Sequence, residues 1–174
     1  MELDQEHEIE VMFAERSITR VINAYAHAAD RGDASLMESL FWPDAVLDIG
    51  IYQGDVRGFM TGFVSAQADT TRVTNHFQGN ILIEVRRAEH VARAETYCIG
   101  GSRVRNDDGS VVDRLAHVRY VDRFEERSGE WRIRRRVVVF DWSGTTPVTS
   151  DDLPKPHYVT GKRGPTDTWH HILD

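Results

Sequence analysis

Residues 111–142 read VVDRLAHVRYVDRFEERSGEWRIRRRVVVFDW, and their pattern largely determines which fold the chain can adopt. Apolar and polar residues alternate along both halves of this stretch, and a period of two is typical of β-strands. The residues between the halves, Arg127-Ser128-Gly129-Glu130, have the composition of a hairpin turn. The stretch therefore predicts two long antiparallel strands, at about 111–126 and 131–142.

The same pattern extends back to residue 79. It predicts strands at about 79–87 and 91–105, joined by the turn Arg87-Ala88-Glu89-His90. A second turn, Asn106-Asp107-Asp108-Gly109, leads into the strand that begins at residue 111. Long strands linked by hairpins form an antiparallel sheet, and a sheet of this length must twist and curl.

Helices are predicted before this sheet. Apolar residues recur at three- and four-residue steps over about residues 6–30, which marks an amphipathic helix. A short helix follows over 33–41 with Asp33 as its cap, and a third is expected at roughly 55–68. Residues 45–49 read as a short strand between them.

This order of elements predicts an α+β fold in which the three helices close the concave face of the sheet around a pocket. We expect one domain over residues 1–144. Residues 145–174 contain four prolines and show no clear period, which predicts an irregular tail that covers the pocket or a subunit contact. The outer face of the final strands carries Trp142 and several valines, so we also expect a homodimer or homotrimer.

Composition limits the class of protein. The 174 residues suit a single hydrophobic core. The net charge of −7 argues against nucleic-acid binding, which needs clustered and unopposed Lys and Arg side chains. The first residues are acidic, and no apolar run reaches the roughly 18 residues of a membrane span. We expect a cytoplasmic protein that binds neither nucleic acid nor a membrane.

The sequence gives no sign of a cofactor or a metal site. Cys98 is the only cysteine, so an intrachain disulfide and cysteine zinc sites are excluded. The chain lacks a P-loop and a Gly-x-Gly-x-x-Gly turn after a strand. His76, His117 and Asp30 could together form an iron site, but no local spacing supports it.

Two polar residues are the candidates for catalysis. His76 lies in the polar segment Thr74-Asn75-His76-Phe77-Gln78-Gly79-Asn80, just before an alternating strand. Asp30 continues an apolar stripe of the first helix at four-residue spacing, so its side chain should point inward. A buried carboxylate without a partner is costly, and His76 is a suitable donor. An aspartate on one ring nitrogen leaves the other as a base that can take a proton from carbon.

Elimination also needs hydrogen-bond donors near the leaving group. Tyr25, Tyr97 and Arg136 are candidates, because Tyr97 and Arg136 lie on strands that we expect to line the concave face. A structural role is the alternative for each of them. The tyrosines could be core aromatics, and Arg136 could pair with Glu95 or Asp141 across the sheet.

The order of elements resembles the SnoaL-like branch of the nuclear transport factor 2 superfamily, a cone-shaped barrel of curved antiparallel or mixed sheet with three helices. The resemblance covers about residues 8–144. Its local matches are Ala29-Asp30, Thr74-Asn75-His76-Phe77 and Gly129-Glu130-Trp131-Arg132-Ile133. The chain looks similar to scytalone dehydratase, γ-hexachlorocyclohexane dehydrochlorinase and bile-acid 7α-dehydratase, which share a histidine–aspartate pair.

The resemblance implies that Asp30 and His76 abstract a proton so that a neighbouring hydroxide or halide leaves. Tyr25 matches a tyrosine of the bile-acid enzyme and replaces a lysine of the dehydrochlorinase. Arg136 matches the pocket arginine of the dehydrochlorinase. His117 falls at a second catalytic histidine of scytalone dehydratase, although a shift of one residue in register would turn it to the outer face.

The resulting prediction is a cofactor-independent lyase of dehydratase type that acts on a small hydrophobic, aromatic or polycyclic hydroxylated substrate. Its catalytic residues would be His76, Asp30 and Tyr25, and the substrate would be bound by Tyr97, Arg136 and His117. Three alternatives stay open: a deformylating, retro-aldol-like lyase for lignin-derived diarylpropane diols, an isomerase, and a non-catalytic module that binds a small ligand or scaffolds other subunits.

Overall fold

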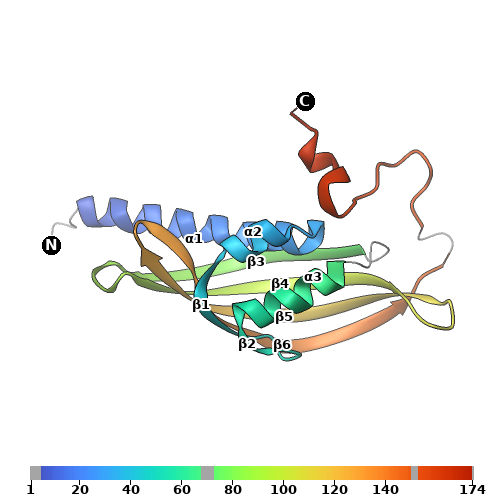
Figure 1. The fold of residues 1–174 in the computed structure, drawn as a ribbon, viewed down its shortest axis with the longest axis horizontal. Coiled ribbons are helices and arrows are strands. Elements are labelled where there is room, and N and C mark those ends of the chain that lie inside the picture. The colour runs from blue at the N-terminus through green and yellow to red at the C-terminus, as the bar shows by residue number, and fades with distance from the viewer. Residues whose placement is uncertain (1–4, 68–72, 150–152, 174) are drawn as a thin grey trace.

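The computed structural model describes residues 5–67, 73–149 and 153–173 (Figure 1). The N-terminal half contains helices α1 (Gln5–Arg31), α2 (Ala34–Ser39) and α3 (Val56–Gln67) and strands β1 (Phe41–Asp48) and β2 (Gln53–Asp55). Four long strands follow, which are β3 (Val73–Arg86), β4 (Val91–Arg105), β5 (Val111–Arg127) and β6 (Glu130–Pro147). Single 3-10 turns lie at η1 (Arg87–Glu89), η3 (Gly164–Thr166) and η4 (Thr168–His170).

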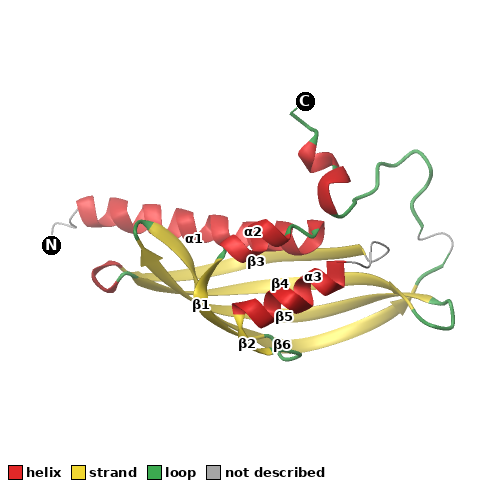
Figure 2. Ribbon diagram, in the orientation of Figure 1, coloured by secondary structure: helices red, strands yellow, loops and turns green. Residues whose placement is uncertain are grey.

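The strands form one curved, unclosed sheet in the order β2-β1-β6-β5-β4-β3. Strand β1 pairs with β6 in parallel, and all other neighbouring strands are antiparallel, so the sheet is mixed. Long helix α1 runs along β3, and α3 packs against α2, β1 and β2 (Figure 2). The α+β fold with three helices in the N-terminal half is therefore confirmed.

The hydrophobic core lies between the helices and one face of this sheet, which we call the inner face; the opposite face is the outer face. Helix α1 buries apolar side chains at three- and four-residue spacing, as its amphipathic pattern predicts. The α1 residues in the core are Ala14, Ile18, Ile22, Tyr25 and Ala28. The sheet contributes Ala92, Ala94, Cys98, Tyr120, Phe124 and Ile133 among others.

Local chemistry explains the helix ends. Gly32 has a φ of 73°, a conformation that glycine adopts without strain, and it ends α1. Asp33 then caps α2, because its carboxylate accepts a hydrogen bond of 2.9 Å from the backbone N–H of Leu36.

Several predicted boundaries were wrong. Strand β3 begins at Val73 and not at residue 79, so the polar segment around His76 is itself part of the sheet. The sequence shows no alternation of apolar and polar residues there, because the inward side chains of Thr74, His76 and Gln78 are polar. In addition, the short helix ends at Ser39, and the first strand begins at Phe41 instead of residue 45.

A β-bulge interrupts β3 beyond His76. Gly79 pairs with Tyr97, whereas the next paired residue, Ile81, faces Thr96. Asn80 has a positive φ of 48° at this point. The bulge keeps both Gln78 and Ile81 on the inner face although they are three positions apart.

The C-terminal segment packs against the end of α1 that leads into α2. Figure 1 shows it in red beside that end of the helix. Arg31 donates a hydrogen bond to Asp167, and the ring of Trp169 lies 5.0 Å from that of His27. Among the helices in the described part of the chain, none is long and apolar enough to cross a membrane.

Candidate active site

Asp30 and His76 meet on the inner face, as the sequence predicts. Asp30 lies in the last turn of α1, and His76 lies in β3. One carboxylate oxygen of Asp30 is 2.7 Å from Nδ1 of His76. The other accepts a hydrogen bond of 2.9 Å from the backbone N–H of the same histidine. The carboxylate therefore fixes both the ring and the backbone of His76.

The charge state of Asp30 determines which ring nitrogen is available. Burial alone would raise the pKa of Asp30, but the hydrogen bonds from the ring and backbone of His76 and from the Thr74 side chain outweigh it and lower the pKa. An ionised carboxylate can only accept, so Nδ1 of His76 carries the hydrogen. The lone pair of the neutral ring is then on Nε2, which is the arrangement of a general base.

Gly100 leaves space beside the ring of His76. It pairs with His76 across β3 and β4. A Cβ atom placed on Gly100 would lie 3.8 Å from Cδ2 and 4.0 Å from Nε2 of His76. The missing side chain therefore leaves space beside the nitrogen that can act as the base.

Arg136 lies fully buried on the same face. Its guanidinium binds Asp122 through two hydrogen bonds of 2.8 and 2.7 Å. Burial opposes its charge, but the carboxylate of Asp122 outweighs burial and raises the pKa of Arg136. The predicted alternative partners were wrong, because Glu95 and Asp141 both pair with Arg119 instead.

Tyr25 connects Arg136 to the histidine. Its ring centroid is 4.0 Å from the guanidinium carbon of Arg136 and 6.5 Å from the ring of His76, which it meets edge-on. Tyr120 lies 4.4 Å from the same guanidinium carbon. Burial raises the pKa of Tyr25, so its hydroxyl stays protonated and can donate.

Several polar atoms on this face lack a partner among the described residues. These buried atoms are Oε1 and Nε2 of Gln78, Oγ1 of Thr96 and Nη1 of Arg136. A buried polar group without a hydrogen bond costs roughly 1–3 kcal/mol, so each would be stabilised by a polar ligand. Sequence reasoning missed Gln78 and Thr96, although Gln78 follows His76 by two positions and therefore shares its face.

Tyr97 lies on the outer face, which corrects its predicted place in the site. Its neighbours Thr96 and Cys98 are buried on the inner face, and alternation turns Tyr97 outward, where it is 47% exposed. Alternate residues of β4 do line the inner face, as expected. Tyr97, however, is one of the β4 residues that point to the outer face.

His117 is on the outer face as well. This is the position expected for it if the strand register is shifted by one residue. It pairs with the exposed Ile99, and its ring stacks on Trp142 at 3.7 Å between centroids. Tyr97, His117 and Trp142 line a shallow outer hollow of about 360 Å³ together with Phe77. Neither Tyr97 nor His117 can therefore contact a substrate held by His76 within the same chain.

This placement also separates the three residues of the alternative iron site. His76 and Asp30 lie on the inner face, whereas His117 lies on the outer face, so the three cannot share one ion. In the described ranges, no group of three or more His, Cys, Asp or Glu side chains is arranged to hold a metal.

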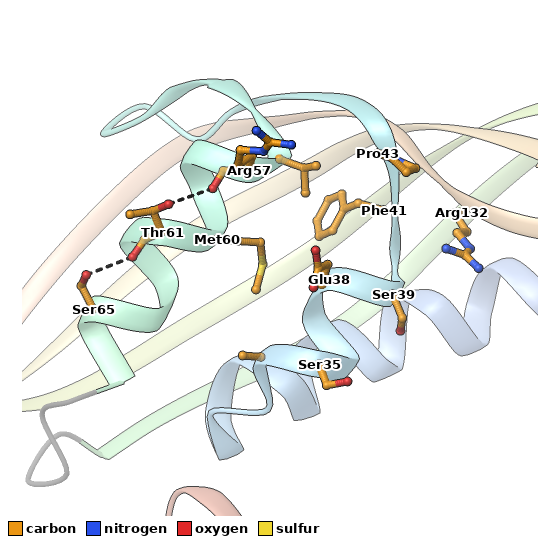
Figure 3. Close-up of a pocket in the computed structure, with 12 residues that line it drawn as sticks. Ser35, Glu38, Ser39, Phe41, Pro43, Arg57, Met60, Thr61, Ser65 and Arg132 are labelled. Atoms are coloured by element: carbon orange, nitrogen blue, oxygen red, sulfur yellow. Dashed lines mark hydrogen bonds between the residues drawn. The ribbon is translucent and has the colours of Figure 1, made fainter.

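A separate cavity of about 1050 Å³ opens between α2, α3 and β1 (Figure 3). The polar side chains that line it include Glu38, Arg57 and Thr61. Neither Asp30 nor His76 lines this cavity. Phe41 forms part of its wall, and the same ring lies 6.4 Å from that of Tyr25, so one aromatic side chain separates the cavity from the buried cluster.

Solved structures share this fold. The chain is similar to a provisionally named scytalone dehydratase of Novosphingobium aromaticivorans, with a TM-score of 0.66 and 16% identity over 87% of this chain and 93% of that one. It is similar to the hexachlorocyclohexane dehydrochlorinase LinA-type3 of Novosphingobium barchaimii, with a TM-score of 0.67 and 16% identity over 86% of this chain and 99% of that one.

A third similar structure is the beta subunit of a provisionally named aromatic-ring-hydroxylating dioxygenase from Novosphingobium aromaticivorans. The TM-score is 0.61 and the identity 21%, over 76% of this chain and 92% of that one. At such identities the likeness establishes the fold alone. A search of curated protein sequences found no significant match. The sequence model of the SnoaL-like domain, however, matches residues 10–137, most of the described fold, and the chain therefore belongs to the SnoaL-like domain family.

Proposed function

We propose that this protein is a cofactor-independent lyase in which His76 removes a proton from carbon. The observation that carries the proposal is the hydrogen bond from Nδ1 of His76 to Asp30, which leaves Nε2 as a base beside the space at Gly100. Membership of the SnoaL-like domain family supports it, as do structural neighbours named for dehydration and dehydrochlorination.

The proposed reaction is the elimination of water. Nε2 of His76 takes the proton from a substrate carbon, and the electron pair of that C–H bond forms a double bond to the neighbouring carbon. The C–O bond on the neighbouring carbon breaks, and the leaving hydroxide receives the proton back from the imidazolium. One C–H and one C–O bond are exchanged for a double bond and water, and Asp30 stabilises the imidazolium in between.

Tyr25 and Arg136 would supply the electrostatic part. The Nη1 group of the positive Arg136 guanidinium has no hydrogen-bond partner among the described residues, and the Tyr25 hydroxyl is protonated. Donors held in a dry site stabilise charge that develops on a substrate oxygen. Apolar Val118 and Val138 pack against the core on the same face, which favours a small hydrophobic or aromatic hydroxylated substrate.

Product mass tests the proposal against its alternatives. The protein would be incubated, without added metal or nucleotide, with a panel of hydroxylated aromatic and polycyclic compounds, and the His76→Ala variant would serve as the control. Loss of one water that depends on His76 supports the dehydratase. Loss of formaldehyde would indicate a retro-aldol-like lyase, and an altered product of unchanged mass would indicate an isomerase. Binding of a panel compound without any His76-dependent product would favour a non-catalytic module.

A further inference from the structure

The C-terminal segment reaches the Asp30–His76 pair through one side chain. Arg163 donates a hydrogen bond of 3.2 Å from Nη1 to the hydroxyl of Thr74 and one of 3.3 Å from Nη2 to the carbonyl of Ala29. Thr74 shares the inner face of β3 with His76, and Ala29 directly precedes Asp30 in α1. A single guanidinium therefore joins the two elements that carry the pair.

The chemistry of the donors sets the direction of the Thr74 hydroxyl. An arginine can only donate, so the oxygen of Thr74 must act as acceptor toward Arg163. A threonine hydroxyl has one hydrogen, which remains available for another acceptor. The Thr74 side chain also hydrogen-bonds to Asp30, whose ionised carboxylate can only accept. The hydrogen bonds therefore run in one direction, from Arg163 to Thr74 and from Thr74 to Asp30.

The neighbours of Arg163 are fixed on α1 as well. Asp167 accepts hydrogen bonds from Arg31 and from the backbone N–H groups of Lys162 and Trp169, at 3.3, 2.9 and 3.1 Å. Gly161 comes so close to Arg31 that an added Cβ would lie 2.8 Å from its Nη1. The chain is thus anchored on both sides of Arg163, which is itself half-buried.

We propose that Arg163 is a positioning residue for the Asp30–His76 pair, acting through the hydroxyl of Thr74 and the carbonyl of Ala29. The two hydrogen bonds described above reach the hydroxyl of Thr74 and the carbonyl of Ala29, which adjoin the pair in β3 and α1. Its role is to hold the end of α1 against β3 and to direct the Thr74 hydrogen onto Asp30. Its effect on turnover rests on the proposed function, whereas its effect on the geometry of the pair does not.

The test combines Arg163→Gln with Thr74→Val in a double-mutant cycle and follows His76 by NMR of ¹⁵N-labelled histidine. Thr74→Val removes the hydroxyl with little change of shape. We expect each single variant to shift the Nδ1 resonance of His76 and to speed exchange of its proton. Where a substrate is in hand, kcat/KM should fall by roughly threefold to tenfold, the worth of one hydrogen bond, with KM nearly constant. In the Thr74→Val background, Arg163→Gln should have a smaller effect than in the wild type, because only its hydrogen bond to the Ala29 carbonyl is left to be lost.

Lys162→Gln is the matched control. It removes one positive charge from the same segment, and its exposed side chain should leave the His76 signals unchanged. Arg163→Lys keeps the charge but not the two-armed geometry, and it should fall between wild type and Arg163→Gln. Circular dichroism and thermal unfolding check that every variant is folded.

The outcomes separate the two proposals. Folded Arg163→Gln protein with unchanged His76 resonances would overturn the positioning role, even if activity fell. Fully additive effects of the two substitutions would also overturn it, because Arg163 would then not act through Thr74. If instead the resonances shift but His76→Ala remains active, the lyase mechanism fails while the positioning role stands.

Discussion

The inner and outer faces of one sheet each carry a histidine close to a tyrosine, yet the two arrangements differ in every physical respect. On the inner face, His76 is bound by the carboxylate of Asp30, and the ring of Tyr25 is buried beside it. On the outer face, His117 stacks on Trp142, and Tyr97 is half exposed. Residue type alone therefore does not identify a site, whereas enclosure and partners do.

The charged pairs show the same contrast. Asp122 and Arg136 are buried completely on the inner face, where removal of one partner strands the other charge. On the outer face, Arg119 pairs with Glu95 and Asp141, and all three side chains are about one-third exposed. Water screens such exposed pairs, so they contribute little to stability. Substitutions matched across the sheet can test this contrast directly.

The largest difference is expected between the two histidines. His76→Ala should lower kcat by a factor on the order of 10²–10⁴, because it removes the general base, while the protein stays folded. His117→Ala should keep nearly full activity. Turnover of the substrate found by the product screen and thermal unfolding would be measured for both. Equal losses in the two variants would contradict the assignment of the inner face, and an unfolded His76→Ala protein would indicate a structural histidine.

The second difference concerns stability. Arg136→Met should reduce the free energy of unfolding by about 3–5 kcal/mol, because Asp122 would be left buried without its counter-charge. Arg119→Met on the outer face should cost at most about 1 kcal/mol. Urea unfolding of both variants checks this. The double variant Arg136→Met with Asp122→Leu should recover much of the loss, and failure to do so would mean that packing and not charge explains the effect.

How far the sequence predicts this contrast depends on the residue. The inward direction of Asp30 follows from its helical stripe, and the need of a buried carboxylate for a donor led correctly to His76. A period of two places Thr96 and Tyr97 on opposite faces, but it does not say which face is the inner one. That missing information turned Tyr97 and His117 into candidates for a site that they do not reach. It also hid Asp122 as the partner of Arg136.

The contact between Arg163 and Thr74 lay beyond any sequence pattern. The two residues are 89 positions apart, and Arg163 belongs to a segment without regular period. The bulge at Gly79 and Asn80 is similarly difficult to predict. It changes which residues of β3 point to the inner face, and the composition gives no clear signal for it. Long-range contacts of irregular segments depend on the assembled fold, whereas strands and amphipathic helices depend on local periodicity.

The third difference concerns association, and we propose that the outer face packs against a second copy of this chain in a homodimer or homotrimer. Exposed apolar residues concentrate there, with Phe77 69% and Trp142 54% exposed, along with Ile99 and Leu115. The neighbouring charges form ion pairs within the chain, Arg119 with Glu95 and Arg103 with Asp113, which limits repulsion between two copies at this face.

Trp142→Lys should weaken this association by roughly 30-fold or more, the usual effect of losing a central aromatic side chain. Light scattering over a range of micromolar protein concentrations measures it, and Met12→Lys on an exposed part of α1 is the control. A wild-type protein that is monomeric throughout would exclude the outer face as an interface.

The fourth difference is between two adjacent glycines. Gly100→Ala places a methyl group 4.0 Å from Nε2 of His76, whereas Gly101→Ala places one 3.4 Å from the Leu115 side chain on the outer face. Neither clashes with the backbone, so both variants should fold. Gly100→Ala should lower kcat/KM by about tenfold through lost space for the substrate. Gly101→Ala should leave it unchanged, and equal effects would show that Gly100 does not face the substrate.

The smallest difference is in the pH dependence of stability. The pKa of Asp30 is lowered in the folded protein, so its carboxylate contributes stability that is fully present above its unfolded pKa of about 3.9. That contribution is lost as the pH falls through the lower, folded pKa. The gap in unfolding free energy between wild type and Asp30→Asn should therefore narrow as the pH falls below about 4.

Urea unfolding from pH 7 down to pH 3 measures this gap. Glu95→Gln serves as the outer-face control, because its carboxylate belongs to an exposed pair whose contribution should be small at every pH. If the free-energy gap between wild type and Asp30→Asn widened as the pH fell, the pKa of Asp30 would be higher in the folded than in the unfolded protein. Asp30 would then be a donor to His76 instead of an acceptor, and Nδ1 of His76 would not need to carry the hydrogen that leaves Nε2 as the base.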